Sequence, residues 1–261
     1  MCKECGCGLG GGDVKIGDPS HAQGSSHHSH DDHGHRHDHG PSHPPLTLNL
    51  NRSLMEKNDR LAERNRGFFR AKKLLVLNVV SSPGSGKTTF IRETAMKLAG
   101  QLRVGVIVGD LATDNDAQRL RSAGIPVVQI TTGTVCHLDA DMVSRAAAQL
   151  ELDKVDVLVI ENVGNLVCPA DYDLGEDLRV VLLSTTEGED KPLKYPPLFH
   201  SANVVVVTKS DLAAAADFHR EQTWVNLKRV SHHAEVFELS TKTGEGMKAW
   251  LEFLVKHQPR V

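Results

Sequence analysis

The chain has 261 residues, 39% of them hydrophobic, and a formal net charge of −3. This length allows one large domain or one domain with tails, and the absence of a basic block argues against a nucleic-acid partner. The longest apolar runs have the length of strands, so no membrane span is predicted. No apolar segment of a secretion signal precedes the body. We therefore expect a cytoplasmic protein whose five cysteines are thiols or metal ligands rather than disulfides.

Residues 1–45 are rich in Gly, His, Ser, Asp and Pro and lack aromatic residues, which predicts a disordered tail. The tail begins with MCKECGCG, in which Cys2, Cys5 and Cys7 form a compact group of thiolates. Thiolates combined with deprotonated backbone amides favour square-planar nickel. A redox-sensitive thiol cluster is the alternative interpretation.

Nine histidines fall between residues 21 and 43. Imidazoles with an ordinary pKa of about 6.5 are mostly neutral in the cytoplasm and bind nickel or zinc. Their irregular spacing predicts several weak, exchangeable sites that store metal, whereas a solvating linker is the alternative. The candidate ligands are His27, His28, His30, His33, His35, His37 and His39.

Residues 46–73 are predicted to form a helix that docks on the body that follows. Ser53 and Glu56 have the spacing of a capping box. A solvated linker helix and a dimer contact remain alternatives. The apolar positions that recur on one face of this helix are Leu54, Leu61 and Phe68.

Residues 74–261 alternate short apolar runs with helical patterns. Runs rich in Val, Ile and Leu that are apolar on both faces predict an α/β fold with a mostly parallel sheet and helices on both faces. The predicted strands are 74–81, 103–109, 126–131, 155–161, 179–184, 203–208 and 234–239. The predicted helices are 87–99, 115–123, 139–150, 215–231 and 246–257.

A glycine-rich turn, SSPGSGKTT, lies between the first predicted strand and a helix. The Walker pattern G-x-x-x-x-G-K-[ST] is matched except at its first position, where Ser81 stands. In a P-loop NTPase fold, Lys87 reaches the β- and γ-phosphates and the hydroxyl of Thr88 binds Mg²⁺. An ordinary glycine-rich turn is the alternative. The predicted nucleotide contacts of this loop are Gly84, Ser85, Gly86, Lys87, Thr88 and Thr89.

A second motif, TKSD, follows a later strand and resembles the guanine-specificity motif of GTPases. Two acceptors on Asp211 match the N1–H and N2–H₂ donors of guanine, which adenine does not offer. Lys209 would lie along the base, with Thr208 at the usual asparagine position. Downstream, GTPases carry an S-A-K motif where this chain has Ser240, Thr241 and Lys242.

Acidic residues end two further predicted strands. Asp110 has the spacing of a residue on the Mg²⁺ side, and Thr113 and Asp116 are available to sense the γ-phosphate. Glu161 and Gly164 form an E-x-x-G version of the GTPase D-x-x-G motif, whose glycine amide meets the γ-phosphate. Polar residues that merely cap buried strands are the alternative.

The body carries a second set of soft metal ligands. Cys136 and His137 are adjacent, and Cys168 follows Gly164 by four residues. This proximity predicts that the nucleotide state moves a metal ligand. Three ligands leave one tetrahedral position for water or for a second subunit. Cys168 by itself is also explained as a small buried apolar residue.

Four segments together resemble the nickel-incorporation GTPases of hydrogenase maturation, the HypB family. These segments are SSPGSGKTT, TTGTVCHLDADM, IENVGNLVCPADYDLGE and TEGEDKPLKYP. The resemblance implies hydrolysis of GTP to GDP with Mg²⁺ while Ni²⁺ is delivered to the large subunit of [NiFe]-hydrogenase. It also implies a HypA-type accessory partner and a homodimer in the GTP- or metal-bound state. It assigns nickel to the N-terminal cysteines, nickel or Zn²⁺ to the three ligands of the body, and nickel storage to the histidine run.

Three rival functions are weighed against this hypothesis. A urease-type nickel GTPase is disfavoured by the N-terminal cysteines and by NLVCPADYDLGE. A metal-storage protein with a merely regulatory or vestigial nucleotide site would show no GTP turnover. Competition by GDP but not by ADP would argue against a P-loop kinase that acts on a small molecule.

Overall fold

The computed structural model describes residues 46–259. The predicted tail, 1–45, lies outside the described residues, so its cysteine and histidine ligands stay predictions. One sheet has the strand order β3-β2-β4-β1-β5-β6-β7, and all its neighbouring strands run parallel. The strands are β1 (Leu75–Val80), β2 (Val104–Asp110), β3 (Val127–Thr131), β4 (Val157–Glu161), β5 (Leu178–Ser184), β6 (Val204–Thr208) and β7 (Glu235–Glu238).

All seven predicted strands are present, and so are the predicted helices. Two short helices between β5 and β6 were not predicted, because their prolines signal a break although proline is tolerated in a first helical turn. The helix predicted over 215–231 begins only at residue 220. The helices are α1 (Leu46–Ala71), α2 (Lys87–Leu98), α3 (Asn115–Ser122), α4 (Ala140–Ala147), α5 (Lys191–Lys194), α6 (Pro196–Ser201), α7 (Arg220–Val230) and α8 (Met247–His257).

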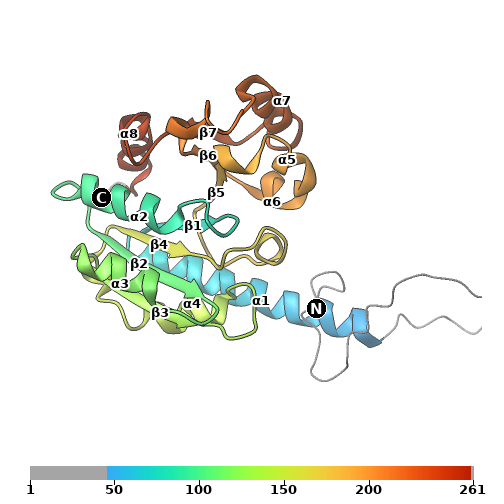
Figure 1. Ribbon diagram of the computed structural model, residues 1–261. Helices are drawn as coiled ribbons and strands as arrows, with labels where there is room; N and C mark the ends of the chain where they lie inside the picture. The colour runs from blue at the N-terminus through green and yellow to red at the C-terminus, as the bar shows by residue number, and fades with distance from the viewer. Residues whose placement is uncertain (1–45, 260–261) are drawn as a thin grey trace, which may run out of the picture.

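The core lies in layers on both faces of the sheet (Figure 1). Alternate residues of β1 face opposite layers: Leu75, Leu77 and Val79 pack with α2, α3 and α8, whereas Val76 packs with α1 and α4. Beyond β1, α6 and α7 pack on β5 and β6. Strands covered on both faces must be apolar on both faces, which explains their Val-, Ile- and Leu-rich sequences.

Helix α1 docks on the body through a different face from the one predicted. Leu54 and Phe68 are 54% and 47% exposed. The buried positions are instead Asn58, Ala62, Asn65 and Phe69, so half of the docking face is polar. The predicted capping box is also wrong, because Ser53 lies inside a helix that begins at residue 46. A search for apolar periodicity cannot find a face that docks through asparagines.

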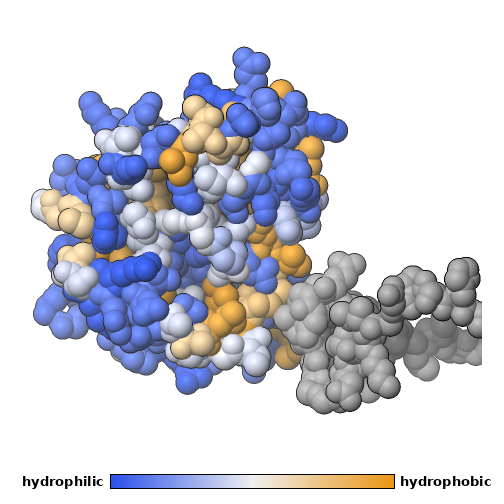
Figure 2. Space-filling model, in the orientation of Figure 1, coloured by the Kyte–Doolittle hydropathy of each residue, from blue (hydrophilic) through white to orange (hydrophobic). Residues whose placement is uncertain are grey.

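Figure 2 shows a mostly hydrophilic face on which the hydrophobic residues form small groups. Among residues 46–259, no helix combines the length and the apolar character that a bilayer crossing requires.

Candidate nucleotide and metal sites

The carboxyl ends of the parallel strands meet at one edge of the sheet. The phosphate loop follows β1, while Asp110 and Glu161 are the last residues of β2 and β4, which neighbour each other and β1 in the order β2-β4-β1. Thr208 ends β6. In open α/β sheets, ligands bind outside this edge. The topology therefore gathers the predicted nucleotide residues from four separate segments.

The phosphate loop passes directly into the first turn of α2. Gly86 has a φ of 96°, a left-handed conformation that glycine adopts without strain, and it forms the N-cap of α2. The ammonium group of Lys87 donates hydrogen bonds to Oγ of Ser81 at 3.1 Å and to the carbonyl of Ser82 at 3.4 Å. The Ser81 hydroxyl also contacts that of Ser85. The serine that departs from the Walker pattern is therefore a buried hydrogen-bonding member of the loop.

The TKSD segment touches the phosphate loop. Thr208 donates its hydroxyl hydrogen bond to the carbonyl of Ser85 at 3.0 Å, and Nζ of Lys209 donates to the carbonyl of Gly84 at 2.8 Å. Asp211 accepts a 2.6 Å hydrogen bond from Ser240. These contacts unite the two motifs. Thr241 and Lys242 directly follow Ser240, and Thr89 is exposed in the first turn of α2.

The hydroxyl of Thr88 donates a 2.7 Å hydrogen bond to Oε1 of Glu161. Glu161 is 2% exposed, and burial raises its pKa to about 7 although Thr88 and Lys87 oppose the shift. Its second oxygen, Oε2, is buried without a hydrogen-bond partner among residues 46–259. Hard oxygen donors of this kind suit Mg²⁺. Thr88 and Glu161 therefore fit a magnesium site.

Asp110 and Asp116 add negative charge beside Glu161, and the charge of each contributes to raising its pKa. Asp110 also accepts a 2.9 Å hydrogen bond from the hydroxyl of Thr113. Burial lowers the pKa of Lys87, and the neighbouring carboxylates oppose this shift. The acidic residues predicted near the phosphates thus lie close enough to Lys87 for their charges to oppose the lowering of its pKa by burial.

Gly164 packs against the phosphate loop. A Cβ at this glycine would lie 3.0 Å from Cγ and 3.2 Å from Cα of Pro83, which is closer than ordinary van der Waals contact. A side chain at this position would require Pro83 to shift by a few tenths of an ångström, so glycine favours the close approach of the segment that follows β4 to the loop. Its predicted contact with a γ-phosphate stays a prediction.

The three predicted ligands of the body form one cluster. One donor atom from each of Cys136, His137 and Cys168 lies within 4.8 Å of the others, and the two sulfur atoms are 2.9 Å apart. A single ion with metal–sulfur bonds of about 2.3 Å can touch both sulfurs. Burial lowers the pKa of His137, which favours the neutral imidazole that binds metals. This S₂N set suits nickel or zinc.

Five buried side-chain atoms lack a hydrogen-bond partner within the described part of the chain. Four belong to the two candidate sites: the hydroxyls of Ser82 and Ser210, Oε2 of Glu161 and Nδ1 of His137. The fifth is Oε1 of Gln129. Buried polar groups are normally paired, so the four atoms at the two candidate sites are places where a ligand would supply the missing partner.

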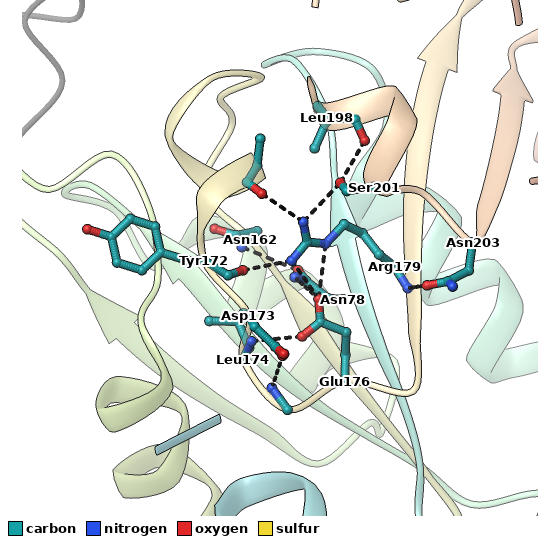
Figure 3. Close-up of polar contacts among 12 residues, drawn as sticks. Asn78, Asn162, Tyr172, Asp173, Leu174, Glu176, Arg179, Leu198, Ser201 and Asn203 are labelled. Atoms are coloured by element: carbon teal, nitrogen blue, oxygen red, sulfur yellow. Dashed lines mark hydrogen bonds and ion pairs between the residues drawn. The ribbon is translucent and has the colours of Figure 1, made fainter. Parts of the chain in front are cut away.

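A buried polar network that the sequence did not predict lies beside the cluster. Arg179 and Glu176, each 7% exposed, form a 2.9 Å ion pair, and Glu176 also accepts a 3.0 Å hydrogen bond from Asn78 (Figure 3). The ring of Tyr172 stacks on that of His137 with centroids 3.9 Å apart. One signal was available: charged and amide residues interrupt otherwise apolar strands at Arg179 and Asn78.

Residues 75–238 match the model of the CobW/HypB/UreG nucleotide-binding domain. The chain is 50% identical over 207 residues to hydrogenase maturation factor HypB of Escherichia coli K12, covering 79% of this chain and 71% of the relative. It is 40% identical to the hydrogenase/urease maturation factor HypB of Helicobacter pylori, covering 78% and 85%. A crystal structure of HypB from Helicobacter pylori in complex with nickel superposes with a TM-score of 0.75 at 40% identity, covering 77% of this chain and 95% of that one. The chain therefore belongs to the HypB hydrogenase maturation factors of the CobW/HypB/UreG family.

Proposed function

We propose that this protein hydrolyses GTP to control the delivery of nickel to the large subunit of [NiFe]-hydrogenase. The observation that carries the proposal is that one short segment joins the two candidate sites. Gly164 packs on Pro83 of the phosphate loop, and Cys168 of the metal cluster follows four residues later. A movement of Gly164 in response to the bound phosphates can therefore displace Cys168, because only a few residues separate the two.

The guanine preference rests on the chemistry of Asp211. Its carboxylate offers two acceptors to the two donors on the edge of guanine, and adenine lacks this pair. The hydrogen bond from Ser240 fixes the orientation of the carboxylate. The contact of Lys209 with the phosphate loop ties the base-reading segment to the phosphate-binding segment.

The chain's own residues would bind and orient the phosphates. Lys87 and the amides at the start of α2 supply positive potential, while Thr88 and Glu161 would hold Mg²⁺, with Asp110 nearby. When bound, this ion neutralises charge on the phosphates. Because Gly164 has no side chain, the segment that leads to the metal cluster can lie close to the phosphate loop.

Nickel is the proposed cargo of Cys136, His137 and Cys168. Metal–sulfur distances are held to within about ±0.2 Å, so a movement of Cys168 by about 1 Å would disturb coordination. The nickel-bound HypB structure from Helicobacter pylori supports nickel as the metal. Zinc at the same ligands is the alternative, and the proposed partners are a HypA-type accessory protein and a second copy of this chain in the GTP- or metal-bound state.

The decisive experiment measures nickel affinity in two nucleotide states. We would use the full chain with Cys2, Cys5 and Cys7 replaced by serine, so that thiolate-to-nickel absorption reports only the body cluster. Affinities with GDP and with a non-hydrolysable GTP analogue should differ about tenfold, and nickel should change GTP-analogue affinity by the same factor, about 1.4 kcal/mol. Cys168→Ala should abolish the signal. Equal affinities in both states would contradict nucleotide control of the cluster.

Storage of nickel is proposed for the histidines between residues 21 and 43, which lie outside the described residues. Deleting 21–43 should remove several weak nickel equivalents in equilibrium dialysis and leave GTP turnover unchanged. Equal nickel counts in both forms would exclude storage.

A urease destination is the second candidate, because the Helicobacter pylori relative is named for both hydrogenase and urease maturation. Nickel transfer from the loaded protein to each purified apo-enzyme, measured side by side, would separate the two destinations.

A further inference from the structure

The segment that carries Cys168 also carries the ring that covers His137. Cys168 begins a short 3-10 turn that ends at Asp171, and Tyr172 follows directly. The Tyr172 ring lies on the His137 ring with a centroid separation of 3.9 Å and an interplanar angle of 24°. The position of Cys168 and the position of the ring that covers His137 therefore depend on the same few residues.

Arg179 fixes the end of that segment. Its Nη1 donates to the carbonyl of Ala170 at 3.0 Å, and its Nη2 donates to the carbonyl of Tyr172 at 2.7 Å. Figure 3 shows the guanidinium between these carbonyls and the carboxylate of Glu176, with the Tyr172 ring directed away from it. A guanidinium has five donors in a rigid plane, so it sets the relative positions of its partners.

The same network also reaches the loop that carries His137. Glu176 accepts a 3.0 Å hydrogen bond from Asn78 of β1, and Asn78 in turn accepts a 3.3 Å hydrogen bond from Asn162. Oδ1 of Asn162 accepts from the amide of Leu138 at 3.3 Å, one residue after His137. Both ligand-bearing loops are therefore attached to one buried chain of hydrogen bonds.

We infer that Arg179 and Tyr172 are positioning residues for the metal cluster. Arg179 sets the spacing between the Cys168 segment and the rest of the fold, and the Tyr172 ring sets the plane of the His137 imidazole. The inference rests on the proposed binding of metal by Cys136, His137 and Cys168. Neither residue is a ligand in this inference, since each acts through the residues that it holds.

The test uses nickel titration of the full chain in the background that lacks the tail cysteines. Tyr172→Leu removes the ring, Tyr172→Phe keeps it, and Arg179→Lys keeps the charge but loses the planar fork. The matched control is Tyr195→Leu, because Tyr195 is the only other tyrosine of the chain. The readouts are nickel affinity from thiolate-to-nickel absorption, the cobalt(II) spectrum as a report of coordination geometry, and GDP affinity without metal.

We expect Tyr172→Leu and Arg179→Lys to weaken nickel binding by about 10- to 100-fold and to change the cobalt spectrum, as loss of residues that orient ligands does. Tyr172→Phe should restore both readouts to within about threefold of the unsubstituted background, and Tyr195→Leu should leave them unchanged. Unchanged GDP affinity would show that the variants are folded. If Arg179→Lys does not fold, the comparison of Tyr172→Leu with Tyr172→Phe decides whether the inference stands.

Nickel affinity and cobalt spectrum that are unchanged in Tyr172→Leu would overturn the inference, while the proposed function would stand if Cys168→Ala still abolished the signal. A loss that Tyr172→Phe shares in full would also overturn it, because the ring would then not be the positioning element. No thiolate–nickel signal in the unsubstituted background would instead contradict the proposed function, and the inference with it.

Discussion

The candidate nucleotide site at the carboxyl edge of the sheet, here called the nucleotide edge, is built in a different way from the candidate metal cluster of Cys136, His137 and Cys168. At the nucleotide edge, short contiguous motifs follow β1, β4 and β6, and the parallel sheet brings their ends together. At the cluster, Cys136 and His137 precede α4 while Cys168 lies beyond β4. Hydrogen bonds of Glu176 and Arg179 hold the Cys168 segment. The loop of Cys136 and His137 is joined to the same network through Asn78 and Asn162.

This difference separates two kinds of positioning. Strand direction and glycine conformation place the phosphate loop, and side-chain hydrogen bonds of Thr88, Thr208 and Lys209 then join it to the ends of β4 and β6. The cluster depends on hydrogen bonds between residues far apart in the chain, including those from Asn58 and Asn65 of α1 to the backbone of Asp173, Ala140 and Leu174. We therefore expect changes in one region to spare the other unless the Gly164–Cys168 segment transmits them.

The strongest test of that independence removes Lys87, the lysine proposed to bind the phosphates. Lys87→Ala should lower GTP turnover by about a thousandfold, because the charge that holds the β- and γ-phosphates is lost. Nickel affinity of the cluster without nucleotide should stay within about threefold. Turnover assays and nickel titration check both statements, with the exposed Lys97→Ala of the same helix as the control. A parallel loss of nickel binding would break the comparison.

Glu161 gives the nucleotide edge a pH dependence. Burial raises its pKa from 4.5 to about 7. Between these values the unfolded chain has released the proton and the folded chain still holds it, so stability falls as pH rises. Without nucleotide, the unfolding free energy of Glu161→Gln is compared with that of the unsubstituted protein. This difference should change in favour of the variant by up to about 3 kcal/mol as the pH rises from 4.5 to 7, and it should stay constant above pH 7.

Denaturant unfolding at pH 5, 6, 7 and 8 measures this difference. Glu252→Gln, at an exposed position on α8, is the control and should show no such trend. A difference that stays constant from pH 5 to 8 would mean that Glu161 ionises in the folded protein as it does in water.

Asp211→Asn sharpens the assignment of the base-reading end. Loss of the bidentate acceptor should weaken GTP binding by about a hundredfold, or about 2.7 kcal/mol, and should improve binding of XTP, whose acceptor suits an amide. Competition binding with both nucleotides measures the change. Asp217→Asn, an exposed aspartate in the same connection, should behave as the unsubstituted protein. Retention of full GTP affinity in Asp211→Asn would remove Asp211 as the base reader.

The smallest expected effect concerns the attachment of α1. Asn65→Ala should destabilise the protein by about 2 kcal/mol, because the buried carbonyls of Ala140 and Leu174 lose their donor. Leu54→Ala, on the exposed face of the same helix, should cost less than about 0.5 kcal/mol. Chemical denaturation of both variants measures the difference. A larger loss of unfolding free energy in Leu54→Ala than in Asn65→Ala would instead support the apolar docking face that the sequence predicted.

Elements that local chemistry specifies could be predicted from the sequence. Runs of strand length predicted all seven strands, and in the five inner strands apolar residues on both faces are the local signal of burial. The phosphate loop was recognisable because its glycines, Lys87 and Thr88 are contiguous, and the sequence also paired Cys136 and His137 with Cys168. The roles assigned to these residues stay predictions, although the structure brings them together.

The docking face of α1, the places of α5 and α6, and the contacts that hold the cluster follow from the folded structure and not from local sequence. Asn65 and Ala140 are 75 residues apart, and Asn78 and Glu176 are 98 apart. Hydrogen bonds over such separations leave no periodicity in the sequence, because either partner taken alone is an ordinary polar residue. Folding gives Arg179 and Tyr172 their significance, since only the folded sheet brings Arg179 to the carbonyls it holds and Tyr172 to His137.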